Sequence, residues 1–108
     1  MSEALDPLIH APTRLRLMAI VASVDDIEFS TLRANLDVSD SVLSKHLAAL
    51  VDAGYLRIRK GRRDARRTTW VSISAAGRRA FRAHVAALRR LIDDVPDSVA
   101  GEPVDRLA

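Results

Sequence analysis

Cysteine is absent from the sequence, which excludes disulfide bonds, thiolate zinc sites and cysteine nucleophiles. Aromatic residues make up only 4% of the chain, so few side chains could stack on the bases of a single-stranded nucleic acid. The four glycines are dispersed, and the sequence has no glycine-rich phosphate loop, no nucleophile elbow and no H-E-x-x-H motif. We therefore expect a protein that is not an enzyme and that needs no metal and no cofactor.

Long hydrophobic runs are missing as well. The longest clearly apolar stretch, Leu17 to Ala22, is far shorter than the roughly 20 residues of a membrane span. Residues 1–20 contain no basic segment followed by an apolar run, so neither a secretory signal nor a membrane partner is predicted. The 108 residues are 48% hydrophobic and 29% charged, which is typical of a single globular domain.

Positive charge is concentrated in one part of the chain. Residues 1–56 carry four basic and eight acidic side chains, residues 57–90 carry twelve and one, and residues 91–108 carry one and five. The three net charges of −4, +11 and −4 add to +3. A basic block in an otherwise acidic chain indicates a polyanionic partner such as nucleic acid, and the alternative is a solvated arginine-rich surface.

Apolar residues repeat with a helical period in the first half of the chain and again near its end, and with a period of two in between. Capping residues set the expected boundaries of the helices. The expected N-caps are Asp6, Ser30, Ser39 and Ser74, with Thr13 or the residues just before it capping the second helix, and Gly54 is the expected left-handed terminator. The expected elements are helices at 5–10, 13–23, 31–36, 39–53 and 74–94, a very short strand at 27–29, and a β-hairpin at 56–73 with a long basic loop at 61–66.

This order of elements predicts a mainly α fold with a small β-hairpin, a winged helix-turn-helix with long N- and C-terminal dimerisation helices. A helix about 12 Å wide fits the major groove of DNA, and a basic hairpin beside it can reach the backbone or the minor groove. We assign residues 1–95 to one DNA-binding and dimerisation domain. Residues 96–108 are acidic and poor in apolar side chains, and we expect a flexible tail there.

The outward face of the helix at 39–53 supplies the first candidate DNA contacts. Ser44 and Lys45 can reach base edges or phosphates. Asp40 is awkward beside phosphates and is expected to serve the helix N-terminus or to accept from a cytosine amino group. His46 borders the buried leucine stripe, so it either forms a hydrogen bond within the domain or contacts phosphate. The candidate set is Ser39, Asp40, Ser41, Ser44, Lys45 and His46, with helix capping as the alternative role of the first serines.

The hairpin is the strongest electrostatic signal, because seven of the eleven residues at 57–67 are basic. Arg62 and Arg63 are placed at its tip, where no core can bury them. Contacts from such a hairpin to DNA would be independent of sequence and sensitive to salt, and a soluble loop kept flexible by like charge is the alternative. The candidate contacts are Arg59, Lys60, Arg62, Arg63, Arg66 and Arg67.

Apolar residues of the last helix follow a heptad-like spacing of 4, 3, 4 and 3. A helix of about 20 residues is about 30 Å long, which is longer than the small core behind it. We therefore expect its C-terminal half, with the N-terminal segment, to pack on a second subunit of a two-fold dimer. The candidate interface residues are Leu5, Leu8, Ile9, Phe81, Val85, Leu88, Ile92 and Val95.

Four stretches of the chain resemble winged-helix transcriptional regulators of the MarR and ArsR type, and the small single-domain branch most closely. They are LDPLIHAPTRLRLMAIV, FSTLRANLDVSDSVLSKHLAALVDAGYLRIRKG, RRTTWVSIS and AAGRRAFRAHVAALRRLI. The resemblance implies a homodimeric cytoplasmic regulator, usually a repressor, that binds double-stranded DNA and is then associated with the nucleoid. It also implies that Ser41, Ser44 and Lys45 face the groove and that Arg62 and Arg63 occupy the wing.

The sequence departs from parts of this family. Metal sensors of the ArsR type use cysteines or paired histidine and aspartate clusters, whereas the three histidines here lie in different elements, so no metal site is expected, with an interfacial site using His10 or His84 as the alternative. The MarR type implies a small aromatic effector, for which Trp70 and His84 are candidate lining residues. Trp70 is expected rather to pack between the hairpin and the last helix. The alternative function is a protein-interaction module that has kept the fold and lost DNA binding.

Overall fold

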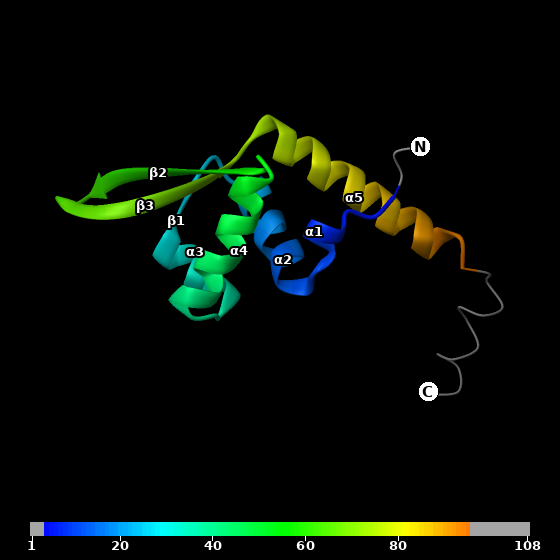
Figure 1. Cartoon of the computed structure of the whole chain (residues 1–108), viewed down its shortest axis with the longest axis horizontal. Coiled ribbons are helices and arrows are strands. Elements are labelled where there is room, and N and C mark those ends of the chain that lie inside the picture. The colour runs from blue at the N-terminus through cyan, green and yellow to red at the C-terminus, as the bar shows by residue number, and fades with distance from the viewer. Residues whose placement is uncertain (1–3, 96–108) are drawn as a thin grey trace.

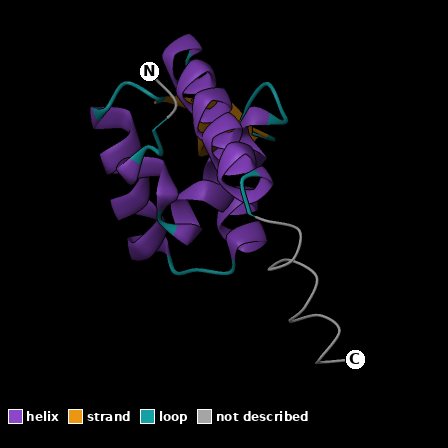
Figure 2. Cartoon of the chain, turned by 90° about the vertical axis from the view of Figure 1, so that its right-hand side faces the viewer, coloured by secondary structure: helices purple, strands orange, loops and turns teal. Residues whose placement is uncertain are grey.

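The structure, a computed structural model, describes residues 4–95 (Figures 1 and 2). Its elements are α1 (Pro7–His10), α2 (Pro12–Ala22), β1 (Ile27–Glu28), α3 (Phe29–Leu36), α4 (Asp40–Asp52), β2 (Leu56–Arg63), β3 (Arg66–Ile73) and α5 (Ala75–Asp93). The predicted winged helix-turn-helix class is confirmed. The predicted tail at 96–108 lies outside the described residues. Within residues 4–95, no helix combines the length and the apolar character that a bilayer crossing requires.

Three helices begin at side-chain caps that the sequence predicts. The Asp6 carboxylate accepts a hydrogen bond from the backbone N–H of Leu8 at the start of α1. The hydroxyls of Ser39 and Ser74 accept from the third residue of α4 and of α5 in the same way. After α4, Gly54 has a left-handed backbone with φ 80°, the conformation in which glycine commonly ends a helix.

One predicted helix start is wrong. Helix α3 begins at Phe29 rather than after Ser30, and its N-cap, Glu28, makes no side-chain capping bond. Because Glu28 is also the last residue of β1, the chain passes from strand to helix without a separate capping turn. Helix α2 begins at Pro12 with Ala11 as its N-cap, which is the second of the two predicted positions, just before Thr13. Proline fits the first helical turn, where its missing N–H costs nothing.

The long loop predicted at 61–66 is also wrong. Strands β2 and β3 stay paired from Leu56 opposite Ile73 to Arg63 opposite Arg66. Only Asp64 and Ala65 remain for the turn, and both have positive φ values of 52° and 67°. Two consecutive left-handed residues define a type I′ turn, whose twist matches that of paired strands. We call this hairpin at 56–73 the wing.

The sheet has the strand order β1-β3-β2, with antiparallel neighbours. Figure 1 shows the wing projecting from one end of the molecule and α5 extending toward the other, with α3 and α4 beneath the base of the wing. Viewed from the side of α5, the other helices pack behind and below it (Figure 2). The tip of the wing, residues 62–67, is exposed.

A single core lies between α2, α3, α4 and the base of the sheet. The predicted leucine stripe of α4 is confirmed, since Leu43, Leu47 and Leu50 are buried. Ile9, which was predicted at a dimer interface, is fully buried in this same core and is unavailable to a partner. The buried residues are Ile9, Leu17, Met18, Val21, Leu32, Leu36, Leu43, Leu47, Leu50, Leu56 and Val71.

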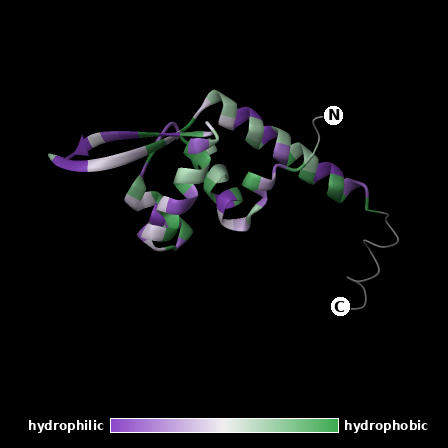
Figure 3. Cartoon of the chain, viewed as in Figure 1, coloured by the Kyte–Doolittle hydropathy of each residue, from purple (hydrophilic) through white to green (hydrophobic). Residues whose placement is uncertain are grey.

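Helix α5 packs on the core through Ala80 and, of the predicted seam, Phe81. Its buried residues are Gly77, His84 and Ala87. A side chain at Gly77 would collide with the backbone carbonyl of Tyr55, so α5 approaches the end of α4 very closely. Farther along, Leu91 and Ile92 are 59% and 67% exposed. In Figure 3, this C-terminal part of α5 carries apolar residues away from the helical body.

Candidate nucleic-acid interface

Helices α3 and α4 form the helix-turn-helix unit. Asp37 closes α3 with a left-handed backbone, and its N–H bonds to the carbonyls of Arg33 and Ala34. The turn sends α4 across the base of the wing, with its leucines inward. The side chains left exposed on α4 include Ser41, Val42, Ser44, Lys45 and Ala48.

Asp40 forms an ion pair with Arg33, with 2.9 Å between the carboxylate Oδ1 and the guanidinium Nε. Both side chains are well exposed, so this pair adds little stability. Its effect is local, because it joins α3 to the first turn of α4. Ser39 caps α4 and its Oγ lies 3.2 Å from the Oγ of Ser41, which confirms the capping role of Ser39.

His46 is half-buried, and its Nδ1 lies 3.2 Å from the Nη1 of Arg14 on α2. The Nε of Arg14 in turn donates to the carbonyl of Leu8. Burial first, then the charges of Arg14 and Lys45, lowers the pKa of His46 below its ordinary value. A neutral imidazole accepts the arginine hydrogen bond, so the prediction of a bond within the domain is confirmed.

A groove of about 510 Å³ separates α4 from the wing. Its floor is apolar, and its polar groups come from both walls. Ser44, Ala48 and Asp52 line the α4 side, and Lys60 and Thr69 line the wing side. The remaining lining residues are Phe29, Leu47, Val51 and Ile58.

The wing has two faces because successive side chains of a strand point to opposite sides. The front face turns toward α4, since Ile58, Lys60 and Thr69 line the groove. The cross-strand partners on this face include Lys60 with Thr69 and Arg62 with Arg67. The rear face carries Arg57, Arg59, Gly61, Arg63, Arg66, Thr68, Trp70 and Ser72.

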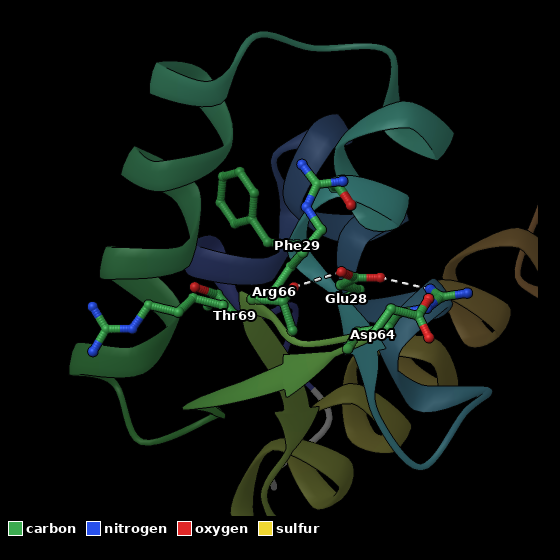
Figure 4. A pocket seen from close by; sticks show the side chains of 9 residues that line it. Glu28, Phe29, Asp64, Arg66 and Thr69 are labelled. Carbon is green, nitrogen blue, oxygen red and sulfur yellow. Dashed lines mark hydrogen bonds and ion pairs between the residues drawn. The ribbon is translucent and has the colours of Figure 1, made fainter.

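Carboxylates neutralise part of the rear face only. Arg59 pairs with Asp26 at 3.2 Å, and Arg63 pairs with Glu28 at 2.7 Å. Glu28 also accepts a hydrogen bond from the hydroxyl of Thr68. This bond, and then Arg63, lowers the pKa of Glu28 below its ordinary value. Glu28, labelled in Figure 4 with dashed lines from its carboxylate, lines a polar hollow of about 540 Å³.

The wing cations therefore differ in their surroundings. Among residues 4–95, the front-face cations Lys60, Arg62 and Arg67 form no ion pair. Lys60 donates to the hydroxyl of Thr69 and Arg62 to the carbonyl of Ala65, and both bonds leave donors for a further partner.

The sequence missed Asp26 and Glu28 as partners of the wing. The short strand predicted at 27–29 could have indicated them. If that strand pairs with the basic hairpin, Asp26 and Glu28 lie beside its arginines. Trp70 is half-buried. Its ring lies under the guanidinium of Arg59, 5.6 Å away, and beside Gly61, and its backbone pairs with Glu28 of β1.

A second polar cluster lies far from the groove, where α1 meets α5. The Asp6 carboxylate accepts from the hydroxyl of Tyr55 at 2.7 Å, and this bond raises the pKa of Tyr55. The ring of His84 is fully buried and contacts the ring of His10 edge-on, with 5.4 Å between centroids. Within the described residues, no group of three histidine or carboxylate side chains is placed to hold a metal ion.

Comparison with known proteins agrees with this geometry. Residues 13–92 match the family described as "Winged helix DNA-binding domain", so the chain belongs to that family. A transcriptional regulator homologue from Pyrococcus horikoshii is 26% identical, with a TM-score of 0.76 over 82% of this chain and 89% of that one. A possible transcriptional regulator for arsenical resistance is 27% identical, with a TM-score of 0.63 over 83% and 94%.

A more distant match shares the fold. The structure of NadR in complex with 4-hydroxyphenylacetate is 19% identical, with a TM-score of 0.66 over 94% of this chain and 73% of that one. Together these findings confirm the resemblance to MarR/ArsR-like regulators. The chain is a DNA-binding transcriptional regulator, and its family is one of regulators rather than enzymes.

Proposed function

We propose that the chain is a dimeric, sequence-specific regulator of duplex DNA, with α4 in the major groove and the wing on the backbone or in the adjacent minor groove. The observation that carries this proposal is the shared groove. Ser44 of α4 and Lys60 of the wing line its two walls, Ser41 and Lys45 are exposed on the same helix, and Arg62 and Arg67 continue the front face of the wing beyond Lys60. A duplex with anionic edges and polar base edges fits that arrangement.

Two kinds of contact are expected, one from α4 and one from the wing. Ser41, Ser44 and Lys45 are exposed on α4, and of these only the lysine is long enough to reach deep into the major groove of DNA. We assign base and nearby phosphate contacts to these three residues. Lys60, Arg62 and Arg67 on the front face are assigned to phosphates, where they fix orientation without reading sequence.

The second copy is expected against α5. The C-terminal half of α5 carries the exposed apolar residues Leu91 and Ile92, with Val95 just beyond the helix. Phe81, Val85 and Leu88 continue this strip and are half-buried, and Leu5 and Leu8 flank it from the N-terminal segment. Covering such a strip with a two-fold partner would place two α4 helices about 34 Å apart, one turn of DNA.

Repression is the expected sign of regulation, because a dimer seated across a promoter blocks access to that DNA. A small-molecule effector is part of the proposal as well. NadR, which shares the fold, is known in complex with 4-hydroxyphenylacetate. A ligand of this chain is expected to shift the distance between the two copies of α4 and thereby change DNA affinity.

Selection of bound duplexes from a random pool tests this function. We expect enrichment of two inverted half-sites whose centres lie about 10 base pairs apart. The Lys45→Ala variant should lose about 1–3 kcal/mol of discrimination between the selected and random duplexes. Val42→Ala, at an exposed position of the same helix, serves as the matched control. Salt-sensitive binding to an acidic protein, with no duplex enriched, would instead support the interaction module.

A further inference from the structure

We propose that Glu28 is a positioning residue for DNA recognition. Together with Asp26, it pairs with Arg59 and Arg63 on the rear face of the wing and keeps these two arginines from phosphate, whereas the front-face cations stay available. The inference rests on the proposed DNA-binding function and deepens it. It removes Arg59 and Arg63 from the set of DNA contacts and assigns them a structural role.

The contacts of Glu28 are the first argument. Its side chain is only 15% exposed, whereas its partner Arg63 is 60% exposed. One carboxylate oxygen lies 2.7 Å from the Arg63 guanidinium, and the other accepts from the hydroxyl of Thr68. Glu28 therefore binds side chains of both strands of the wing, since Arg63 belongs to β2 and Thr68 to β3.

The position of Glu28 in the chain is the second argument. It is the last residue of β1 and the N-cap of α3, so it belongs to the chain that leads directly into the helix-turn-helix. Backbone pairing of Glu28 with Trp70 adds a second link to β3. The angle between the wing and α4 is thus fixed through the start of α3. A wing fixed at one angle can contact the DNA backbone only when α4 lies in the major groove of the DNA.

Electrostatics is the third argument. Arg59 and Arg63 are each matched by a carboxylate within ion-pair distance. A phosphate that recruited either arginine would have to break that pair and leave an acidic group beside DNA. Phosphate binding to the front-face cations breaks no such pair. Asp52 also lines the groove, but it forms no ion pair with them.

The Glu28→Gln variant separates positioning from net charge. Glutamine keeps an oxygen that can accept from Thr68, and it loses the pair with Arg63. Asp64→Asn is the matched control, because it removes the same charge at the tip of the wing. Within residues 4–95, Asp64 forms no ion pair, and asparagine tolerates its left-handed backbone. Both variants are measured in the full chain against a selected duplex and a random duplex over a salt series.

Glu28→Gln should reduce the ratio of selected to random affinity about tenfold, the scale of one lost charge-assisted hydrogen bond. Freed Arg63 should also steepen the salt dependence by about one phosphate contact, a slope change of about 0.9. Arg63→Gln should reduce the ratio similarly without steepening the slope, and the double variant should be no worse than Glu28→Gln. Thermal unfolding of each variant shows whether it is folded.

Equal behaviour of Glu28→Gln and Asp64→Asn, with both raising affinity for all duplexes alike, would overturn the positioning role. The negative charge of Glu28 alone would then explain its effect on DNA binding. That result leaves the proposed function intact, because the wild-type chain would still discriminate between duplexes. A wild-type chain that binds selected and random duplexes equally would contradict both proposals.

Discussion

The Nδ1 atom of His84 accepts a hydrogen bond from the backbone N–H of Asp6 at 2.9 Å, which joins α5 to the N-terminal segment. The ring is fully buried, and its Nε2 has no partner among the described residues. Only a neutral imidazole can accept at Nδ1, so this contact requires the uncharged ring. Helices α1 and α5 carry most of the expected dimer surface, and the state of His84 therefore matters for both folding and assembly.

Lowering the pH should destabilise the fold. Burial first, then His10, lowers the pKa of His84 below 6.5, against an opposing effect of Asp6. The unfolded chain then binds protons more readily than the folded chain, so the free energy of unfolding falls as the pH drops through 6.5 toward the folded pKa. Above that window the stabilisation is complete. The pKa of His46 is lowered as well, so His46 contributes to the loss of stability in the same direction.

Urea unfolding at pH 7.5 and 5.5 measures this effect. His84→Asn keeps an acceptor in place of Nδ1 and cannot titrate, so it should lower stability at pH 7.5 and reduce the pH dependence. His10→Asn, at an exposed position, removes the second cause of the lowered pKa of His84, so it should reduce the pH dependence only in part and change stability at pH 7.5 less. An unchanged pH dependence in His84→Asn would contradict the account of His84.

Gly77→Ala should destabilise the protein by about 3 kcal/mol, because the added methyl group collides with the backbone carbonyl of Tyr55. Helix propensity alone predicts the opposite sign, a gain of about 1 kcal/mol for alanine inside a helix. The exposed neighbour Ala76 provides the control, since Ala76→Gly should cost only about 1 kcal/mol. Denaturant midpoints of the two variants decide the matter, and a stabilised Gly77→Ala would refute the close approach of α5.

The two faces of the wing should differ in their effect on DNA binding. Arg62→Gln and Arg67→Gln, on the front face, should each weaken binding to every duplex and reduce the slope of log K against log salt by about 0.9. Arg59→Gln, on the rear face, should leave that slope nearly unchanged because Arg59 is paired with Asp26. Anisotropy titrations over a salt series provide the measurement. Equal slopes for front and rear variants would show that the faces are equivalent.

Charged substitutions on α5 should separate the dimer. Leu88→Glu combined with Ile92→Glu places carboxylates on the apolar strip, and the variant should sediment as a monomer with weaker DNA binding. Ala83→Glu adds one charge at an exposed position on another face of α5 and should leave the assembly unchanged. Sedimentation of the wild-type chain as a monomer at micromolar concentration would contradict the dimer itself.

Most of the fold could be predicted from the sequence because its signals are local. Ser39 and Ser74 precede their helices as caps, and the leucine period of α4 marks the face that is buried. The wing turn was missed because Asp64-Ala65 lacks the glycine that usually marks a type I′ turn. Local propensity therefore favoured a loop, and strand pairing overrode it.

The site was predicted less completely, because its arrangement depends on contacts between distant residues. A run of arginines indicates an anionic partner, but it does not show which arginines are already paired. Asp26 and Glu28 lie more than 30 residues before Arg59 and Arg63. Ile9 was likewise assigned to an interface because its apolar character fits a core and an interface equally well.

Discrimination between duplexes tests the central claim most directly. The purified chain is titrated by fluorescence anisotropy into a duplex pool from its own promoter and into a random-sequence duplex, across a salt series. We predict tight binding to the promoter pool and weaker, steeply salt-dependent binding to the random duplex. Equal affinity for both duplexes at every salt concentration would contradict a sequence-specific regulator.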